Sequence, residues 1–498
     1  MGTPKNFRTI LFAILTLLML MPLNAQRSQA KQPPVVDLCH FGIGLALGVS
    51  GYDLSILGVG GYLDWGVTRS KSVPENILYF YVLNVSNQAY PGVLKNLPAR
   101  IAKNPGAFWI IGNEPDSEVN YQDHISAESY ATRYYELASI IRQQDPEAHI
   151  GFGTIIQPSQ IRITYLQKTL DTMVKLAGGN RSKALGLIDI YTIHAFILNE
   201  EKLYNSKGQT INWGAGLPIG YEPSWGSPEV ILISAGVDES WKTHSIDIFK
   251  RRVIRFREWM KAQGEQNKPL WITEYGSLFP SSGDGYLTVS DQDTVAFMEQ
   301  TFDFVLGTKN KSLGYAGDDD RLVQHMLWYS LNDYRWHFGG SLYDPTTRSR
   351  TFVGDHFISY NPSTSIVPVG QVDVTVLAQA PQVSPGGWGN APGTHNYRIR
   401  VRAANLISSD RLTAVQVDLY EGSRWVGSTK GSLPRCAGQA EFAITDYNLT
   451  PGEQHTYRAV ISLLPDNGVE TNPANQDVTL PSVTLPSFKA FFLPVIRR

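Results

Sequence analysis

The stretch that decides the fold is residues 108–155, FWIIGNEPDSEVNYQDHISAESYATRYYELASIIRQQDPEAHIGFGTI. It begins with an apolar run, Phe108–Asn113, and continues through an amphipathic stretch, Ala127–Gln144. A second apolar run, His149–Ile155, closes it. Apolar runs that alternate with helical patterns predict βα units and a parallel sheet. The stretch therefore predicts one strand–helix–strand unit.

The same alternation extends in both directions along the chain. Eight apolar runs lie between residues 41 and 331: Phe41–Leu47, Tyr62–Trp65, Ile77–Leu83, Phe108–Asn113, His149–Ile155, Leu187–Ala195, Pro269–Tyr275 and His325–Leu331. Helical patterns fall between several of them: Ala127–Gln144, Ile163–Ala177, Ile246–Gln263 and Asp293–Leu306. Eight strands with interposed helices predict a (β/α)₈ TIM barrel, which we place at residues 36–362. No glycine-rich phosphate fingerprint follows the first run, so a dinucleotide-binding fold is not favoured.

After Tyr360 the pattern changes. Residues 361–365, NPSTS, are typical of a linker. Beyond them apolar and polar residues alternate strictly, as in Tyr397–Arg402 and Val415–Leu419. This alternation predicts half-buried antiparallel strands, and hence an all-β, immunoglobulin-like sandwich over residues 366–486. Residues 487–498 are expected to form a C-terminal tail, either an edge strand or a sorting segment.

The first thirty residues have the features of a secretory signal peptide. Lys5 and Arg8 precede an apolar run, Ile10–Leu23, and Ser28–Ala30 offers a small-x-small cleavage site. The apolar run is shorter than the roughly 17 residues that span a bilayer, so cleavage is favoured over an uncleaved anchor. We expect a secreted or cell-surface protein without a membrane span in the mature chain.

The mature chain would contain two cysteines, Cys39 and Cys436, too far apart in sequence to suggest a metal site. One interdomain disulfide and two independent buried thiols both remain open.

Composition excludes several classes of protein. Lys and Arg number 43 and Asp and Glu 45, for a net charge of −2, which leaves no basic surplus for a nucleic-acid partner. A hydrophobic fraction of 42% excludes an acidic disordered chain. The 11 Trp and 24 Tyr suit a protein that stacks aromatic rings against ligands, although aromatics also fill cores.

Two glutamates stand where strands end. Run four closes on Asn113-Glu114-Pro115, and run seven contains Glu274 in WITEYGS. In a barrel, the C-terminal strand ends form the mouth, where active sites of this fold lie. Burial of a carboxylate there costs desolvation free energy, so its presence indicates a chemical role. Two carboxyls on opposite sides of one mouth are the pair that glycoside hydrolysis needs, one protonated and one ionised.

These motifs resemble the glycoside hydrolases of clan A, retaining enzymes on a (β/α)₈ barrel. The resemblance covers roughly residues 40–360. The sequences of its two motifs are similar to those of the endo-β-1,3-glucanase-like and family 39-like branches. It implies that Glu114 is the acid/base, Glu274 the nucleophile, and Asn113 a ligand of the sugar 2-hydroxyl. The C-terminal region more weakly resembles adhesion-related bacterial β-sandwich domains.

Further residues are candidates for substrate binding. Run six ends in His194-Ala195-Phe196. Several branches of the clan have a tyrosine in place of Phe196, and the resemblance implies that its hydroxyl would bond the nucleophile. His194 either orients substrate or bonds backbone in the core. Trp328, on run eight, matches the clan's tryptophan platform beneath the sugar. Three other tryptophans at strand ends or in loops complete the set: Trp65, Trp225 and Trp336.

The sequence thus predicts a secreted retaining glycoside hydrolase that acts on a polysaccharide or oligosaccharide, with no cofactor and no metal. The His and Asp clusters of a metal-dependent barrel hydrolase are missing from the strand ends. The alternative is a non-catalytic carbohydrate-binding or adhesive surface protein with a degenerate barrel, and its C-terminal domain would bind cell-surface glycans. The replacement of tyrosine by Phe196 motivates this alternative.

Overall fold

The computed structural model describes residues 39–119, 121–201, 203–204, 210–212, 214–229, 240–281, 288–333, 338–360, 371–407, 410–436 and 438–487. The expected signal peptide, residues 1–30, and residues 488–498 of the expected tail lie outside these ranges. Within the described part of the chain, no helix is long and apolar enough to cross a membrane.

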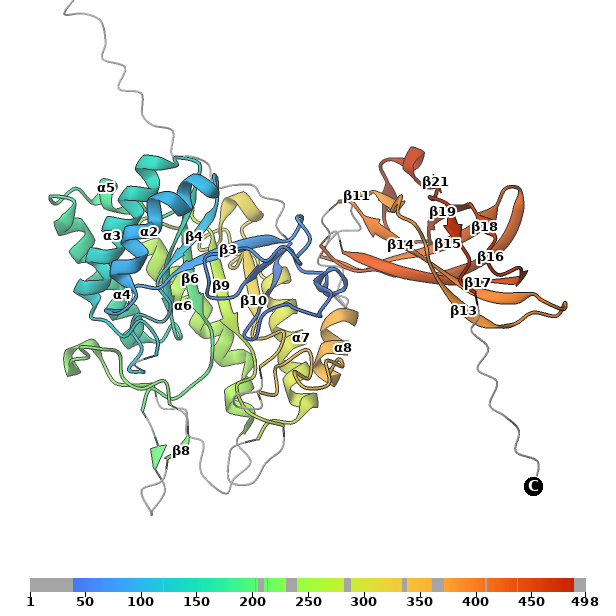
Figure 1. Ribbon diagram of the computed structural model, residues 1–498. Coiled ribbons are helices and arrows are strands. Elements are labelled where there is room, and N and C mark those ends of the chain that lie inside the picture. The colour runs from blue at the N-terminus through green and yellow to red at the C-terminus, as the bar shows by residue number, and fades with distance from the viewer. Residues whose placement is uncertain are drawn as a thin grey trace, which may run out of the picture. The chain divides into compact units, whose positions relative to one another are not determined.

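Eight parallel strands close into a barrel in the order β1-β10-β9-β6-β5-β4-β3-β2 (Figure 1). The strands are β1 Phe41–Gly44, β2 Gly61–Leu63, β3 Leu78–Leu83, β4 Phe108–Ile111, β5 His149–Ile155, β6 Ile190–His194, β9 Leu270–Tyr275 and β10 His325–Trp328. Each begins or ends within a few residues of one of the eight predicted runs. The predicted (β/α)₈ barrel is therefore confirmed.

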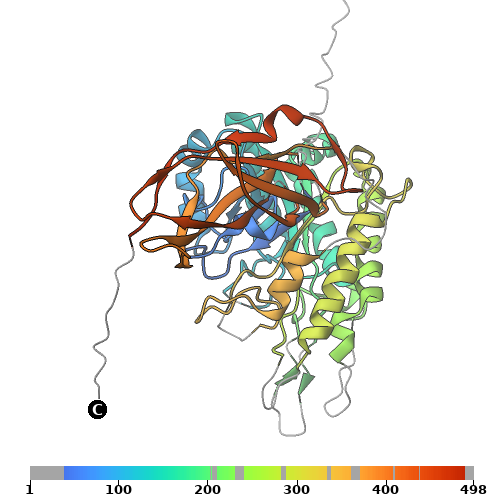
Figure 2. The same ribbon diagram turned by 90° about the vertical axis from the view of Figure 1, so that its right-hand side faces the viewer.

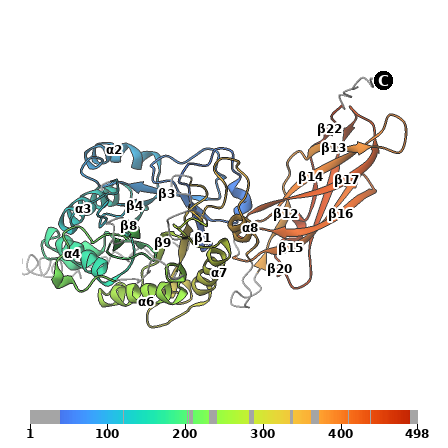
Figure 3. The same cartoon turned by 90° about the horizontal axis from the view of Figure 1, so that it is seen from below.

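Helices cover the outside of this barrel (Figure 3). They are α2 Tyr90–Lys103, α3 Ala127–Gln144, α4 Gln160–Leu176, α5 Arg181–Leu185, α6 Ile246–Ala262, α7 Asp291–Gly307 and α8 Phe352–Ser359. Several begin at a serine or threonine whose hydroxyl accepts a backbone N–H of the first turn, as Ser126 does from Ser129 at 3.3 Å. A short strand pair, β7 Leu203–Tyr204 and β8 Thr210–Asn212, lies in the long segment after β6.

The barrel strands have two apolar faces, as expected of a parallel sheet. One face lines the barrel interior, where Phe80, Phe108, Trp271 and Leu327 pack together. The other face packs against the helices. Because side chains alternate along a strand, neighbours in sequence belong to different layers. This alternation decides which strand-end residues reach the mouth.

Apart from one short parallel pair, β11 with β20, the C-terminal strands form antiparallel sheets that share one apolar core, consistent with a β-sandwich (Figure 2). One sheet contains β12 Val374–Val376, β13 Gln382–Trp388, β14 His395–Asn405 and β17 Gln439–Leu449. The other contains β16 Arg424–Leu433, β15 Thr413–Glu421, β19 Tyr457–Leu463 and β21 Asp477–Thr479. Two short pairs complete it, β11 Gln371–Val372 with β20 Val469–Glu470, and β18 Gln454–His455 with β22 Val483–Thr484.

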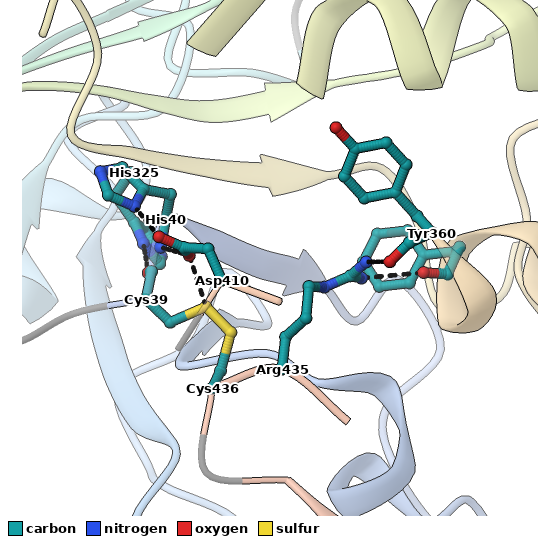
Figure 4. Close-up of a disulfide and its surroundings, with 8 residues drawn as sticks. Cys39, His40, His325, Tyr360, Asp410, Arg435 and Cys436 are labelled. Carbon is teal, nitrogen blue, oxygen red and sulfur yellow. Dashed lines mark hydrogen bonds and ion pairs between the residues drawn. A yellow bond between two sulfur atoms is a disulfide. The ribbon is translucent and has the colours of Figure 1, made fainter. Parts of the chain in front are cut away.

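The two cysteines are joined in a disulfide between Cys39 and Cys436 (Figure 4). Beside it, His40 Nδ1 lies 2.7 Å from Asp410 Oδ2, and Nε2 lies 3.2 Å from Asp318. Burial works to lower the pKa of His40, but these two carboxylates raise it to about 10. Arg435 donates to the backbone oxygens of Tyr360 and Phe357 at 2.7 and 2.8 Å. The disulfide is thus one of several contacts that tie residues 39–40 and 357–360 to residues 410–436.

Candidate active site

Glu114 and Glu274 come to the same end of the barrel from opposite sides. Glu114 follows β4, the fourth barrel strand in chain order, and Glu274 lies near the end of β9, the seventh. Both carboxyls are largely buried, with 8% and 7% of each residue exposed. Glu114 has a left-handed backbone (φ 46°), held by its N–H, which donates to Thr154 O at 3.0 Å. The turn after β4 therefore fixes the direction of the Glu114 side chain.

His194, the last residue of β6, lies between the two carboxyls. Its Nδ1 is 3.0 Å from Glu114 Oε1, and its Nε2 is 3.2 Å from Glu274 Oε1. Carboxyl oxygens of Glu114 and Glu274 approach each other within 4.8 Å. His194 faces Glu274 because the β6–β9 pairing shifts register between Ile193 and His194. The structure thus brings three predicted site residues together.

Burial dominates the electrostatics of this cluster. It raises the pKa of Glu274 from 4.5 to about 7; the neighbouring Glu114 adds to the rise, while His194 and the Trp65 N–H oppose it. For His194, burial lowers the pKa, but the carboxylates of Glu274 and Glu114 more than offset this, so the pKa is raised. The cluster therefore takes up a proton as the pH falls through about 7.

Trp65, directly after β2, donates its indole N–H to Glu274 Oε1 at 2.6 Å. It was predicted as a substrate-binding residue at the mouth, and the structure places its indole in contact with Glu274. Phe196 packs edge-on to the His194 ring, with ring centroids 6.2 Å apart. As a phenylalanine it has no hydroxyl to donate to Glu274.

Asn113 is held within the turn after β4. Its side-chain N–H donates to Gln122 Oε1 at 2.7 Å, and its backbone N–H donates to Asp123 Oδ2 at 2.6 Å. Asp123 also accepts the backbone N–H groups of Val85 and Ser86. Burial raises the pKa of Asp123 to about 7, although these N–H bonds lower it. These contacts of Asp123 were not predicted from the sequence, because Asp123 lies in a loop with no motif to mark it.

A second buried network lies behind the same turn. Arg162, on α4, is fully buried and forms ion pairs with Asp116 and with Glu200, the latter at 3.0 Å. It also donates to Gly216 O at 2.6 Å. Arg162 thereby joins the turn after β4 to the segment after β6. Asp116 stands in the quoted NEPD motif, yet its distant partners give no local pattern in sequence.

The structure corrects the assignment of Trp328 as the sugar platform. Trp328 is 1% exposed, its indole N–H bonds Gly340 O at 2.7 Å, and its ring packs on Tyr275 and Phe302 in the helix-facing layer. The reason is strand alternation, because Leu327 faces the barrel interior and its neighbour must face outward.

Tyr329 takes the position expected of Trp328. Its ring lies 5.6 Å from the Trp65 ring and 6.1 Å from the Phe196 ring, and its hydroxyl donates to Asp333 at 2.6 Å. Tyr329 is the aromatic residue of this strand end that reaches the site.

Trp225 is also placed differently from its prediction as a substrate-binding residue. It is 6% exposed and lies in a short 3₁₀ turn, Pro223–Trp225, with the Lys168 ammonium of α4 4.6 Å from its ring centroid. Trp225 packs against α4 and thereby holds its long loop in place. Trp336 lies outside the described residues.

The Glu114–His194–Glu274 cluster also has the donor types that bind a divalent cation, with one donor atom from each residue lying within 4.8 Å of the others. Both imidazole nitrogens, however, already face a carboxyl oxygen. A cation would have to break these contacts to use the histidine. The donor set thus fits the carboxyl pair of acid–base chemistry better than a metal centre.

Comparison with known proteins identifies no family for this chain. No protein-family model and no curated protein matches the chain. Similar solved structures include an exo-β-1,3-glucanase of GH128 subgroup VI from Aureobasidium namibiae, with 11% identity over 62% of this chain and 92% of that chain and a TM-score of 0.37.

Two others are a monomeric β-xylosidase from Caulobacter crescentus CB15 (13% identity, 84% of this chain, 98% of that chain, TM-score 0.40) and a GH128 subgroup VII oligosaccharide-binding protein from Trichoderma gamsii (11%, 66%, 94%, 0.38). These neighbours thus include glycoside hydrolases. Because these identities and TM-scores are low, the function of this chain has to be inferred from its own site.

Proposed function

We propose that the chain is a retaining glycoside hydrolase that cleaves O-glycosidic bonds of a polysaccharide or oligosaccharide. One observation carries the proposal: Glu114 and Glu274 meet across the barrel mouth, with oxygens within 4.8 Å and His194 between them. Retaining enzymes hold their carboxyls about 5–5.5 Å apart, whereas inverting enzymes leave about 6.5–9.5 Å for a water. The spacing supports the retaining mechanism.

In this proposal Glu274 is the nucleophile and Glu114 the acid/base. Trp65 and His194 Nε2 both face Glu274 Oε1, and N–H donors stabilise an ionised carboxylate. With Nε2 protonated, neutral His194 presents the lone pair of Nδ1 to Glu114, which suits a protonated Glu114. With His194 in this tautomer, the hydrogen bonds support Glu114 as the proton donor of the pair.

The reaction then follows in two displacements. Glu274 attacks the anomeric carbon as the bond to the leaving oxygen breaks, and Glu114 gives that oxygen its proton. The glycosyl ester neutralises Glu274, so ionised Glu114 next takes a proton from water, which attacks the anomeric carbon and frees Glu274. Asn113 is proposed to bond the sugar 2-hydroxyl, and Tyr329 to contact the sugar face.

We also propose that the chain is exported and acts outside the cell. The signal-peptide pattern of residues 1–30 supports this, as does the Cys39–Cys436 disulfide, since disulfides persist in oxidising compartments. The sandwich is proposed as an accessory domain, residues 366–486, beside a catalytic domain of residues 36–362.

The test begins with β-1,3-, β-1,4- and mixed-linkage glucans, mannans, xylans and arabinans as substrates. Glu274→Ala should lose turnover by at least about 10⁴-fold and regain it with azide, giving a glycosyl azide of inverted configuration. Glu114→Ala should give an azide of retained configuration with an activated aryl glycoside. Glu75→Gln, at an exposed glutamate of the barrel, serves as the control.

Full activity in Glu274→Ala would contradict the proposal. Glycan binding without release of reducing sugar on every substrate would favour the non-catalytic alternative instead.

A further inference from the structure

The two oxygens of the Glu274 carboxylate have different surroundings. Oε1 faces both the indole N–H of Trp65, at 2.6 Å, and His194 Nε2, at 3.2 Å. Oε2 has no hydrogen-bond partner among the described residues. A carboxylate held through one oxygen presents the other in a fixed direction. The asymmetry therefore marks Oε2 as the oxygen free to attack.

Trp65 is itself held in place for this contact. Its backbone is left-handed (φ 56°), which is uncommon for a residue with a side chain. Asp64 Oδ1 accepts the N–H of Gly66 at 3.0 Å and the hydroxyl of Tyr79 at 2.5 Å, and so bridges the turn on both sides of Trp65. A Cβ on Gly66 would lie 3.0 Å from Asp64 Oδ1, so a larger residue there would press on this carboxylate.

The indole ring is fixed from a second side. The Trp65 and Tyr329 rings pack nearly edge to face, with centroids 5.6 Å apart and planes at 64°. Gly44 of β1 leaves room for the Trp65 ring, because a Cβ at this position would lie 3.3 Å from the ring edge. The N–H edge of Trp65 is thus directed at Glu274 by both its backbone and its ring contacts.

We propose that Trp65 is the positioning residue of the nucleophile: its indole N–H and the imidazole of His194 clamp Glu274 Oε1, so that Oε2 alone attacks the anomeric carbon. The inference rests on the proposed glycosidase mechanism and deepens it. It also accounts for Phe196, since the donor that this residue lacks is supplied from β2. Trp65 acts through Glu274, and its ring need not stack on sugar.

A direct test observes the hydrogen bond without turnover. In the full chain labelled with ¹⁵N-tryptophan, the Trp65 indole resonance is identified by its loss in Trp65→Phe. Glu274 faces His194 from β6, Glu114 from the turn after β4 and Trp65 from β2, so its ionisation should move this resonance near pH 7. In Glu274→Gln the movement near pH 7 should shrink to what His194 causes. A Trp65 resonance that does not move with pH, or that moves identically in Glu274→Gln, would overturn the proposal.

Kinetics then separate positioning from sugar stacking. Trp65→Phe keeps an aromatic ring but loses the N–H, so we expect kcat to fall about 10²-fold, with KM changed less than about threefold. The acid limb of kcat/KM should move to higher pH by about one unit, because Glu274 loses a donor to its ionised form. A raised KM with unchanged kcat and pH profile would assign Trp65 to sugar stacking and overturn the proposal.

The matched control is Trp259→Phe on α6, which also removes an indole hydrogen bond, to Gln167 at 2.9 Å. Its kinetics should equal those of the unsubstituted chain. If the unsubstituted chain hydrolyses no glycoside, the proposed function fails, while the indole titration still decides whether Trp65 binds Glu274.

Discussion

At the scale of single residues, the site keeps an ionisable group where water is scarce. Burial raises the pKa of Glu274 to about 7, against 4.5 for an unperturbed glutamate. Between these two pH values the folded chain holds a proton that the unfolded chain has released. The stability of the folded chain therefore falls as the pH rises through this window, and above about pH 7 the loss is complete.

Glu274→Gln should remove this pH-dependent loss. Because glutamine does not ionise, the variant should exceed the unsubstituted chain in free energy of unfolding by about 3 kcal/mol at pH 8. The difference should shrink toward zero near pH 4.5. Denaturant unfolding at both pH values measures it, and a difference that does not change with pH would contradict the assigned burial cost.

Sequence predicts part of this site and misses the rest for identifiable reasons. Glu114 and Glu274 were predicted because each stands at the end of an apolar run. Burial of a carboxylate there costs desolvation free energy, which indicates a chemical role. Trp328 was predicted at the mouth by resemblance, without regard to strand alternation. Because Leu327 faces the barrel interior, its neighbour Trp328 belongs to the helix-facing layer. The contacts of Trp65 and His194 with Glu274 depend on a left-handed turn and a register shift, and neither leaves a pattern in the sequence.

At the scale of elements, Arg162 connects three segments that surround the mouth. It pairs with Asp116 after β4 and with Glu200 after β6, and all three side chains are fully buried. Removal of one partner from such a network leaves charges without compensation, which is far more costly than loss of an exposed pair. The position of the turn that holds Glu114 should therefore depend on a residue that does not touch substrate.

Arg162→Ala should lower the free energy of unfolding by about 3–5 kcal/mol, since two carboxylates are left buried without their cation. Lys175→Ala, an exposed site on the same helix, should change it by less than about 0.5 kcal/mol. Denaturant unfolding of both variants provides the comparison. Equal, small losses in the two variants would show that the network is not required.

At the scale of the whole molecule, one disulfide links residues 397 positions apart in sequence. Its removal frees a long loop of the unfolded chain, so Cys39→Ala with Cys436→Ala should lower the free energy of unfolding by about 2–5 kcal/mol. A thiol reductant should lower the melting temperature of the unsubstituted chain and leave that of the double variant unchanged. Equal melting temperatures with and without reductant would contradict the pairing.

The architecture was more predictable than the site. Eight apolar runs and the strict alternation after Tyr360 report directly on buried strands, and both patterns are local in sequence. The pairing of Cys39 with Cys436 was left open, because nothing local selects one disulfide over two buried thiols. Contacts across hundreds of residues are set by the packing of the finished fold, and sequence patterns record only its elements.

The central claim, that Glu114 and Glu274 carry out a double displacement, is tested most directly by the configuration of the first product. Proton NMR of the anomeric signals, recorded before mutarotation on a substrate found in the polysaccharide screen, distinguishes the two outcomes. The account predicts that the first sugar released retains the anomeric configuration of the bond that was cleaved. Release of the inverted anomer would contradict it.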